Sequence, residues 1–200
     1  MLFEKLNSGN QERAIAEIKD NDGYFEYEDS VEHIKTDFKT ILELFGYYNI
    51  NCYYSGFSSQ GDGASFTASY YHEPRLLQKI KSYAPQDEEL HRLAKELTNT
   101  QRKVRYDLGA KLTTSGANYS HEMTMRVETH SNNSLVDEDI IAEKCEDEIL
   151  EHSRDLARWY YKKLNEAYDY SMLDETVKAY IIANEIDFDY EDNDDEIPHT

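Results

Sequence analysis

The sequence has few of the residues that build disulfide frameworks, tight loops and membrane spans. Of its 200 residues, 2 are Cys, 3 are Pro and 8 are Gly. Cys52 and Cys145 lie far apart without zinc-ligand spacing, which excludes a disulfide scaffold and gives no reason to expect a metal. No stretch approaches the roughly 18 apolar residues of a membrane span, so we expect no membrane association. With no secretory signal at the N-terminus, the cysteine usage predicts a reducing, cytoplasmic environment.

Basic residues are also scarce, and the imbalance is concentrated near the C-terminus. The chain holds 41 Asp and Glu against 21 Lys and Arg, a formal net charge of −20. Residues 137–200 contribute 21 acids and 6 bases, a net of −15, whereas residues 1–136 contribute 20 acids and 15 bases, a net of −5. Such a field repels nucleic acid and anionic lipid and attracts basic protein surfaces. We therefore expect a protein partner, with no direct contact to nucleic acid or membrane.

What the chain does have is aromatic residues and regular hydrophobic patterning. Aromatics make up 12% of it, with 17 Tyr, more than a disordered acidic chain carries. Helical periodicity predicts helices over residues 11–19, 30–45, 87–101, 137–168 and 173–184. Alternation predicts two β-hairpins, one with strands at 50–57 and 66–70, the other with strands at 104–112 and 119–127. The expected fold is α+β, an antiparallel sheet of about four strands packed against helices, with a long C-terminal helix.

The predicted organisation is one domain followed by an acidic tail. We expect a single α+β domain over residues 1–186, because 200 residues suit one core. Residues 187–196 hold seven acids and no base, so residues 187–200 are expected to form a flexible tail. Cys145 is predicted to be an inert core thiol, and His121 a core histidine, because each falls on an apolar face. The oligomeric state stays open, and a homodimer is compatible with the sequence.

The start of the long predicted helix holds a dense row of acids opposed by one base, Lys144. Eight carboxylates lie within residues 137–151, which form about 22 Å of helix at 1.5 Å per residue. That is roughly one negative charge per 3 Å, close to one phosphate per 3.4 Å along a DNA strand. A solvated face is the alternative, although such a face usually carries mixed charge. The predicted partner-binding residues are Asp137, Glu138, Asp139, Glu143, Glu146, Asp147, Glu148 and Glu151 in the helix, with Asp187, Asp189, Glu191 and Asp192 in the tail.

The most distinctive short motif is Gly56–Gly63, a glycine-bearing loop between the first two predicted strands. Its Ser58, Gln60 and Asp62 could contact a ligand, with His72 as a further polar group. The loop lacks the lysine and the strand-to-helix setting of a phosphate-binding loop, and Asp-Gly is also an ordinary turn pair. A structural hairpin, a ligand site and a catalytic site are therefore alternatives. Since no set of nucleophile, base and orienting group can be assigned, we predict no catalytic residue, cofactor or metal ligand.

Three segments of the chain are similar to a group of known proteins. Residues 52–66 read CYYSGFSSQGDGASF, which resembles a signature of small, uncharacterised bacteriophage and prophage proteins. The segments WYYKKL at 159–164 and ANEIDF at 183–188 are similar to the C-terminal parts of the same proteins. The resemblance implies a phage origin but no activity. In charge and size alone, the chain also resembles acidic DNA mimics, such as antirestriction and anti-CRISPR proteins, with which phages disarm host defence.

The sequence supports two hypotheses of different kinds. The first is a non-enzymatic phage inhibitor in the host bacterial cytoplasm, whose acids replace phosphates on a basic, nucleic-acid-binding surface of a host defence protein. A variant of this hypothesis has the same physics with a target in host transcription or replication. The second is a small-ligand-binding or enzymatic phage protein that uses the Gly56–Gly63 loop. Asp62→Ala separates them, because only the second hypothesis expects lost activity with an intact fold.

Overall fold

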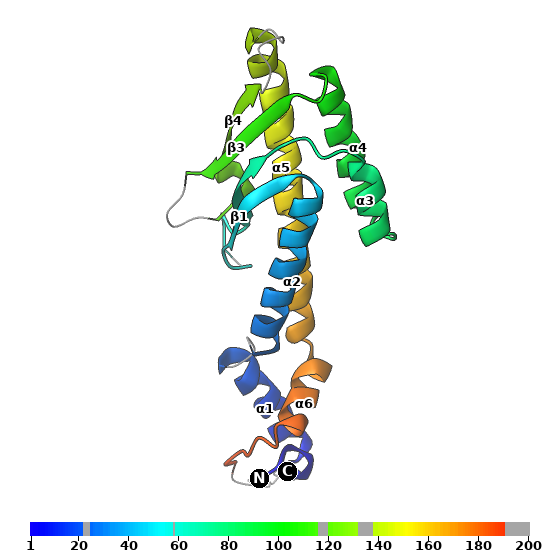
Figure 1. Cartoon of the computed structure of the whole chain (residues 1–200). Helices are drawn as coiled ribbons and strands as arrows, with labels where there is room; N and C mark the ends of the chain where they lie inside the picture. Colours follow the sequence, from blue (N-terminus) through cyan, green and yellow to red (C-terminus); the bar gives the residue numbers. More distant parts are fainter. Residues whose placement is uncertain (22–24, 58, 116–119, 132–137, 191–200) are drawn as a thin grey trace, which may run out of the picture. The chain divides into compact units, whose positions relative to one another are not determined.

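The structure is a computed structural model that describes residues 1–21, 25–57, 59–115, 120–131 and 138–190 (Figure 1). Its helices are α1 (Ser8–Asn21), α2 (Phe25–Leu44), α3 (Leu76–Tyr83), α4 (Glu88–Lys103), α5 (Glu138–Ser171) and α6 (Asp174–Ala183). Its strands are β1 (Tyr47–Tyr54), β2 (Ala64–Tyr70), β3 (Leu108–Thr114) and β4 (Met125–Ser131). Two short 3-10 helices, η1 (Phe3–Lys5) and η2 (Glu122–Thr124), complete the set. The α+β class predicted from the sequence is confirmed.

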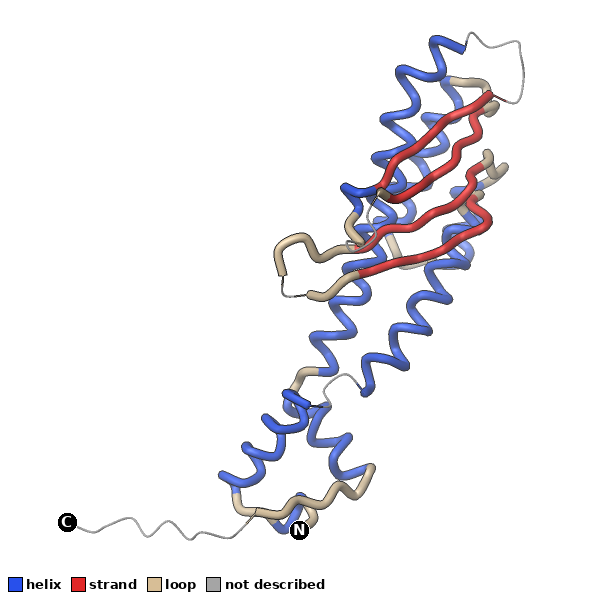
Figure 2. The backbone as a smooth tube through the Cα atoms, turned by 90° about the vertical axis from the view of Figure 1, so that its left-hand side faces the viewer, coloured by secondary structure: helices blue, strands red, loops and turns tan. Residues whose placement is uncertain are grey.

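The strands form one antiparallel sheet in the order β1-β2-β3-β4 (Figure 2). Both predicted hairpins are present, and α3 and α4 connect β2 to β3. Strand β1 contains one extra residue between Tyr48 and Asn51, where the backbone of Asn49 is left-handed with φ 55°. An extra residue of this kind forms a β-bulge, which bends the strand and increases its twist. The bulge keeps Tyr47 and Cys52 on the same face of the sheet.

One face of the sheet is covered by helices, and the other is open (Figures 1 and 2). Strand β2 buries Phe66 and Tyr70 on the covered face, whereas Thr67 and Ser69 alternate with them and are half-buried. Because side chains alternate along each strand, the strand register assigns the remaining residues to the two faces. We call the uncovered surface the open sheet face. Its exposed side chains are Tyr48, Asn51, Tyr53, Tyr71, Lys111, Arg126, Glu128 and His130.

The core between sheet and helices is centred on Phe38 of α2, which is fully buried. Its ring stacks on Tyr160 of α5 at 4.4 Å, lies 6.1 Å from the Trp159 ring, and meets Phe66 edge-on at 5.8 Å. Offset-stacked and edge-to-face pairs of this kind add to the free energy gained by burial alone. The side chain of Trp159 also donates a hydrogen bond to Asp87 Oδ2, the N-cap residue of α4, at 2.9 Å. Phe38 therefore links α2 and α5 to the sheet.

The chain divides into two compact units, whereas the sequence analysis expected one domain over residues 1–186. The larger unit is Glu32–Asn165 and contains the sheet, and the smaller comprises Met1–Val31 and Glu166–Thr200. Within the smaller unit, Phe188 is buried beside Phe3 and Ile181, and its N–H donates to the Met1 carbonyl. The phenol of Tyr190 donates to Glu17 at 2.6 Å. Packing thus continues past the predicted tail boundary at 187, as far as Tyr190.

Strand β1 covers residues 47–54 and not the predicted 50–57, and the predicted starts of β3 and β4 are wrong. Helix α4 runs through Lys103, and Arg105 and Tyr106 adopt left-handed backbone conformations, so β3 begins at Leu108 and not at 104. The buried Gln101 side chain donates to the Leu108 carbonyl and the Tyr70 hydroxyl, which fastens this turn to the sheet. In the second case, residues 121–124 form η2 and its cap, so β4 begins at Met125 and not at 119.

The structure differs from the sequence-based expectations at three further places. His121 is a half-buried cap of η2, whose Nδ1 accepts from the Met123 N–H at 3.1 Å, and it is not a core histidine. Helix α3 was not predicted, because eight residues with only two buried side chains give a weak periodic signal. Helix α2 begins at Phe25 and not at residue 30, where the predicted helix began.

Candidate functional site

A groove of about 520 Å³ lies between α4 and α5 in the larger unit. Helix α4 contributes Glu96, Asn99, Thr100 and Lys103, and α5 contributes Asp147, Glu148, Glu151, His152 and Asp155. We call it the acidic groove, because its lining holds five carboxylates and one ammonium group. Its volume falls within the range typical of ligand-binding clefts.

Helical periodicity places these side chains on facing surfaces. Asp147, Glu151 and Asp155 are four residues apart, so they form one stripe along α5 with about 6 Å of rise between neighbours. The opposite side of α5 buries Ile149 and Leu156 in the core. The amphipathic pattern of α5 therefore directs its acids toward the groove when its apolar side meets the sheet.

A chain of polar contacts crosses the groove floor from α4 to α5. The Lys103 ammonium lies 2.5 Å and 2.8 Å from the two Glu148 carboxylate oxygens. The Thr100 hydroxyl donates to Glu148 Oε2 at 2.7 Å, and His152 Nε2 lies 3.1 Å from the same hydroxyl. Because the threonine proton is used on Glu148, His152 Nε2 carries the proton of that second bond. The Glu148 carboxylate is thus fixed in orientation at the groove floor.

Burial and hydrogen bonding shift the pKa of Glu148 in opposite directions. Burial alone would raise its pKa, but the hydrogen bonds from Lys103 and Thr100 outweigh that effect, so its pKa lies below the ordinary value. The pKa of Glu151 is also lowered, chiefly by the hydrogen bond from Arg154. Both carboxylates are therefore ionised at neutral pH.

His152 gives the groove a testable pH dependence. Burial lowers the pKa of His152 below its ordinary value of 6.5, although neighbouring carboxylates favour the charged form. The unfolded chain therefore takes up this proton at a higher pH than the folded chain. The contribution of neutral His152 to the unfolding free energy is fully present above about pH 6.5. It is lost as the pH falls through the folded-state pKa of His152. The carboxylates Glu148 and Glu151 titrate below this window, because their pKa values are lowered.

We expect His152→Gln to flatten this pH dependence. Urea unfolding at about pH 7.5 and pH 5.5 should show a smaller fall in unfolding free energy for the variant than for the wild type. His72 is a matched control, because burial lowers its pKa as well. His72→Gln should remove only the part of the pH dependence that comes from His72. An identical fall in wild type and His152→Gln would contradict the assignment.

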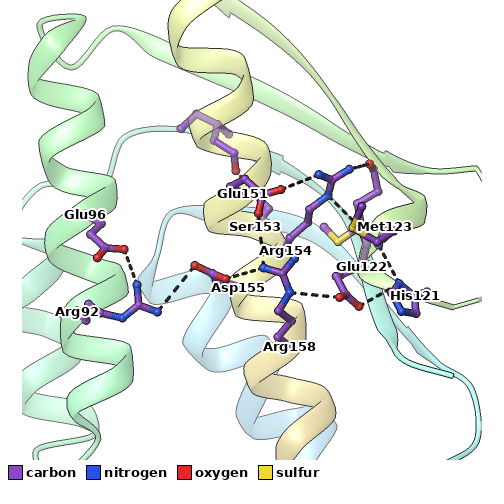
Figure 3. A network of polar contacts seen from close by, with 12 residues as sticks. Arg92, Glu96, His121, Glu122, Met123, Glu151, Ser153, Arg154, Asp155 and Arg158 are labelled. Carbon is purple, nitrogen blue, oxygen red and sulfur yellow. Dashed lines mark hydrogen bonds and ion pairs between the residues drawn. The ribbon is translucent and has the colours of Figure 1, made fainter. Parts of the chain in front are cut away.

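Three arginines hold the carboxylates at the groove edges (Figure 3). Arg92 of α4 lies 2.7 Å from Glu96 and 3.8 Å from Asp155. Arg158 lies 2.7 Å from the other Asp155 oxygen and 3.5 Å from Glu151. The remaining contacts are Arg154 to Glu151 at 2.7 Å and Arg158 to Glu122 at 3.2 Å. With Glu122 included, the groove and its edges hold six carboxylates and four cationic side chains. The site therefore keeps a net negative charge, but most of its carboxylates are paired with cations.

The chemistry of the groove side chains suits the binding of cationic groups. Thr100 donates its proton to Glu148 but is only 2% exposed, whereas a nucleophilic hydroxyl must face the substrate. Among the described residues, no cluster of three or more His, Cys, Asp or Glu has the arrangement to hold a metal ion. Carboxylates with remaining lone pairs in a cleft suit guanidinium and ammonium groups.

Comparison with known proteins assigns a family. Residues 31–174 match a family described as domain of unknown function DUF8835. The chain belongs to this family. The DUF8835 region includes the whole sheet and both helices of the acidic groove. No curated protein matches the chain, and no solved structure matches it.

Within the DUF8835 region, the structure brings together only some of the predicted partner-binding acids. Asp147, Glu148 and Glu151 line the groove, whereas Glu146 accepts from Thr129 of β4 at 3.1 Å. The backbone of residues 138, 139 and 143 lies in α5, but the side chains of Glu138, Asp139 and Glu143 lie outside the described part. Asp137, Glu191 and Asp192 also lie outside the described residues, and Asp187 and Asp189 belong to the smaller unit.

Sequence reasoning missed two of the groove's carboxylates. Asp155 lies four residues after Glu151, so continuing the helical stripe past the acidic run would have found it. Glu96 lies on a different helix, and no sequence pattern connects it to α5.

In the Gly56–Gly63 loop, the side chain of Asp62 stabilises a turn. Asp62 Oδ2 accepts from the Ser59 N–H at 2.6 Å, and the Asp62 N–H donates to the Ser59 carbonyl at 3.1 Å. Gly61 has φ 95°, a left-handed conformation that glycine adopts without steric cost. Tyr161 of α5 donates to the Gly56 carbonyl at 3.0 Å and so fastens the loop. These contacts favour a structural role for Asp62 in the hairpin over a role in binding a ligand or in catalysis.

The remaining polar groups of the ligand hypothesis are not gathered into one site. Gln60 is exposed, and Ser58 lies outside the described residues. Asp62 precedes β2 and His72 follows it, so the two lie at opposite ends of a seven-residue strand about 20 Å long. His72 lines a different pocket of about 280 Å³ with Tyr106, whose ring is 4.7 Å away. The structure therefore does not bring Asp62 and His72 together.

Burial raises the pKa of both cysteine thiols. Cys145 is buried, and burial raises the pKa of its thiol, which disfavours the nucleophilic thiolate. Cys52 is half-buried, and burial raises its pKa to about 11. No helix in the part of the chain that the structure describes has both the length and the apolarity to cross a membrane.

Proposed function

We propose that this protein is a non-enzymatic, phage-encoded inhibitor that binds a basic, nucleic-acid-binding surface of a host defence protein through the acidic groove. The observation that carries the proposal is the convergence of five carboxylates from two helices on one cleft with a single ammonium group. The net charge of −20 adds a long-range field that steers basic surfaces toward the chain.

The groove suits the side chains with which such a partner contacts phosphates. Lysine and arginine supply most charged contacts to nucleic-acid backbones. Glu148 and Glu151 each keep lone pairs beyond those used by Lys103 and the arginines, because a carboxylate has about four acceptor positions. A partner arginine entering the groove can therefore bind without first displacing the cations already there.

The proposed mimicry does not reproduce the charge spacing of a DNA strand. The stripe of Asp147, Glu151 and Asp155 has one charge per about 6 Å of helix, whereas a DNA strand has one phosphate per about 3.4 Å. The proposal therefore rests on discrete carboxylate clusters that occupy a few basic side chains. Their occupation blocks nucleic acid in the cytoplasm of a bacterial host, in keeping with the phage resemblance.

The test is a pull-down from bacterial lysate with the tagged full-length chain, eluted with duplex DNA and identified by mass spectrometry. We expect elution of a basic nucleic-acid-binding protein, such as a nuclease, a methyltransferase or a CRISPR component. The interaction should weaken as NaCl is raised, because exposed charges are screened. Capture of no basic partner, or of one that DNA does not release, would contradict the proposal.

A further inference from the structure

The open sheet face is rich in aromatic side chains that contact one another. Tyr48, Tyr53 and Tyr71 are 38%, 43% and 41% exposed, and each presents a large apolar ring to solvent on this face. The ring of Tyr48 stacks on Tyr71 at 5.3 Å, and Tyr71 meets His130 edge-on at 5.7 Å. His130 in turn lies over Gly109, where an added Cβ would overlap the imidazole. An aromatic row thus crosses the sheet from β1 to β4.

The same face has little net charge and leaves its ions unpaired. Its exposed ionic groups are two bases, Lys111 and Arg126, and one acid, Glu128. Lys111 and Glu128 are directly opposite each other on β3 and β4, yet none of the three forms an ion pair within the described chain. In a protein with a net charge of −20, this surface carries no excess of acid.

We infer that the open sheet face binds a second copy of this chain in a twofold-symmetric dimer. Two copies that each carry −20 repel one another, so they can meet only through a surface without excess acid. A twofold contact is self-complementary, and it would set Glu128 of one copy near Lys111 or Arg126 of the other. Tyrosine is enriched in such interfaces, where its ring packs and its hydroxyl keeps a polar partner.

The size of the face predicts a weak dimer. Four strands about 4.8 Å apart, with seven or eight residues at about 3.3 Å each, give a projected area of roughly 450 Å². A standard interface buries about 800 Å² per partner, so affinity in the micromolar range is expected. The helices cover the other face of the sheet, so this contact leaves the acidic groove of each copy accessible (Figures 1 and 2). The inference does not depend on the proposed function.

Sedimentation velocity of the full-length chain tests the dimer directly. The dimer fraction should rise with concentration from about 1 to 200 µM, and it should rise further with NaCl, because salt screens the repulsion between copies. This salt effect is opposite in sign to that expected for the acidic groove. Arg126→Glu should keep the chain monomeric across the series, because it adds acid to the interface.

Lys81→Glu is the matched control, since it makes the same change in net charge at an exposed position of α3, away from the sheet. It should dimerise like the wild type, and circular dichroism should show that both variants are folded. A wild-type chain that stays monomeric at every concentration would overturn the inference. Equal effects of the two variants would overturn it as well, as would a monomer whose open sheet face binds a single-stranded oligonucleotide.

Discussion

Converting Asp147, Glu151 and Asp155 together to Asn, Gln and Asn should weaken binding to the captured basic partner by about 10- to 100-fold, or roughly 1.4 to 2.8 kcal/mol. These residues form the acidic stripe of α5 along the groove, so the variant removes three charges while keeping side-chain size and shape. The salt dependence of the affinity should also become shallower, since fewer ionic contacts remain to be screened. Titration calorimetry at several NaCl concentrations measures both effects.

The control removes the same three charges elsewhere. Glu12, Asp20 and Glu175 are exposed and lie outside residues 31–174, the region that matches DUF8835. Their conversion to amides changes net charge by the same amount, so a general field effect would weaken binding equally in both triple variants. Equal weakening would contradict a role for the groove, whereas a loss confined to the groove variant would support it.

Replacing Phe38 with Ala should lower the unfolding free energy of the larger unit by about 3–5 kcal/mol. The ring is fully buried and contacts Tyr160, Trp159 and Phe66, so its removal leaves a cavity where α2 and α5 meet the sheet. Phe38→Leu refills part of that space and should cost less than Phe38→Ala. Urea unfolding followed by the fluorescence of Trp159, the single tryptophan, measures these differences at the site itself.

An exposed aromatic residue provides the comparison for Phe38. Tyr170 is 63% exposed, so Tyr170→Ala should change the unfolding free energy by no more than about 0.5 kcal/mol. If Phe38→Ala were as mild as Tyr170→Ala, the core described around Phe38 would be wrong. Unfolding of the Leu variant at the same urea concentration as the Ala variant would argue against a cavity as the cause.

The sequence predicted the fold class because its strongest patterns are long. The apolar seam of α5, with Cys145, Leu156 and Leu164 buried, repeats over about twenty residues, and such a signal has few alternative interpretations. The boundary of β3 was harder to predict. Val104, Tyr106 and Leu108 alternate like a strand, but the chain turns through two left-handed residues that the Gln101 side chain fastens to the sheet. That contact is tertiary, and alternation alone cannot reveal it.

The candidate site was predictable only in part for a related reason. Three groove acids lie in the acidic run that the charge distribution singled out, so composition alone was enough to find them. The pairing of Glu148 with Lys103 and the contribution of Glu96 depend on where α4 packs against α5. The linear charge density of the sequence therefore could not show which carboxylates face one another and which are paired with cations.

Competition with duplex DNA for the captured partner tests the central claim most directly. Fluorescence anisotropy of labelled DNA bound to that partner would be followed as this protein is added. The account predicts full release of the DNA by the wild-type chain, and release by the groove variant only at about 10- to 100-fold higher concentration. A ternary complex in which partner, DNA and this protein coexist would contradict it.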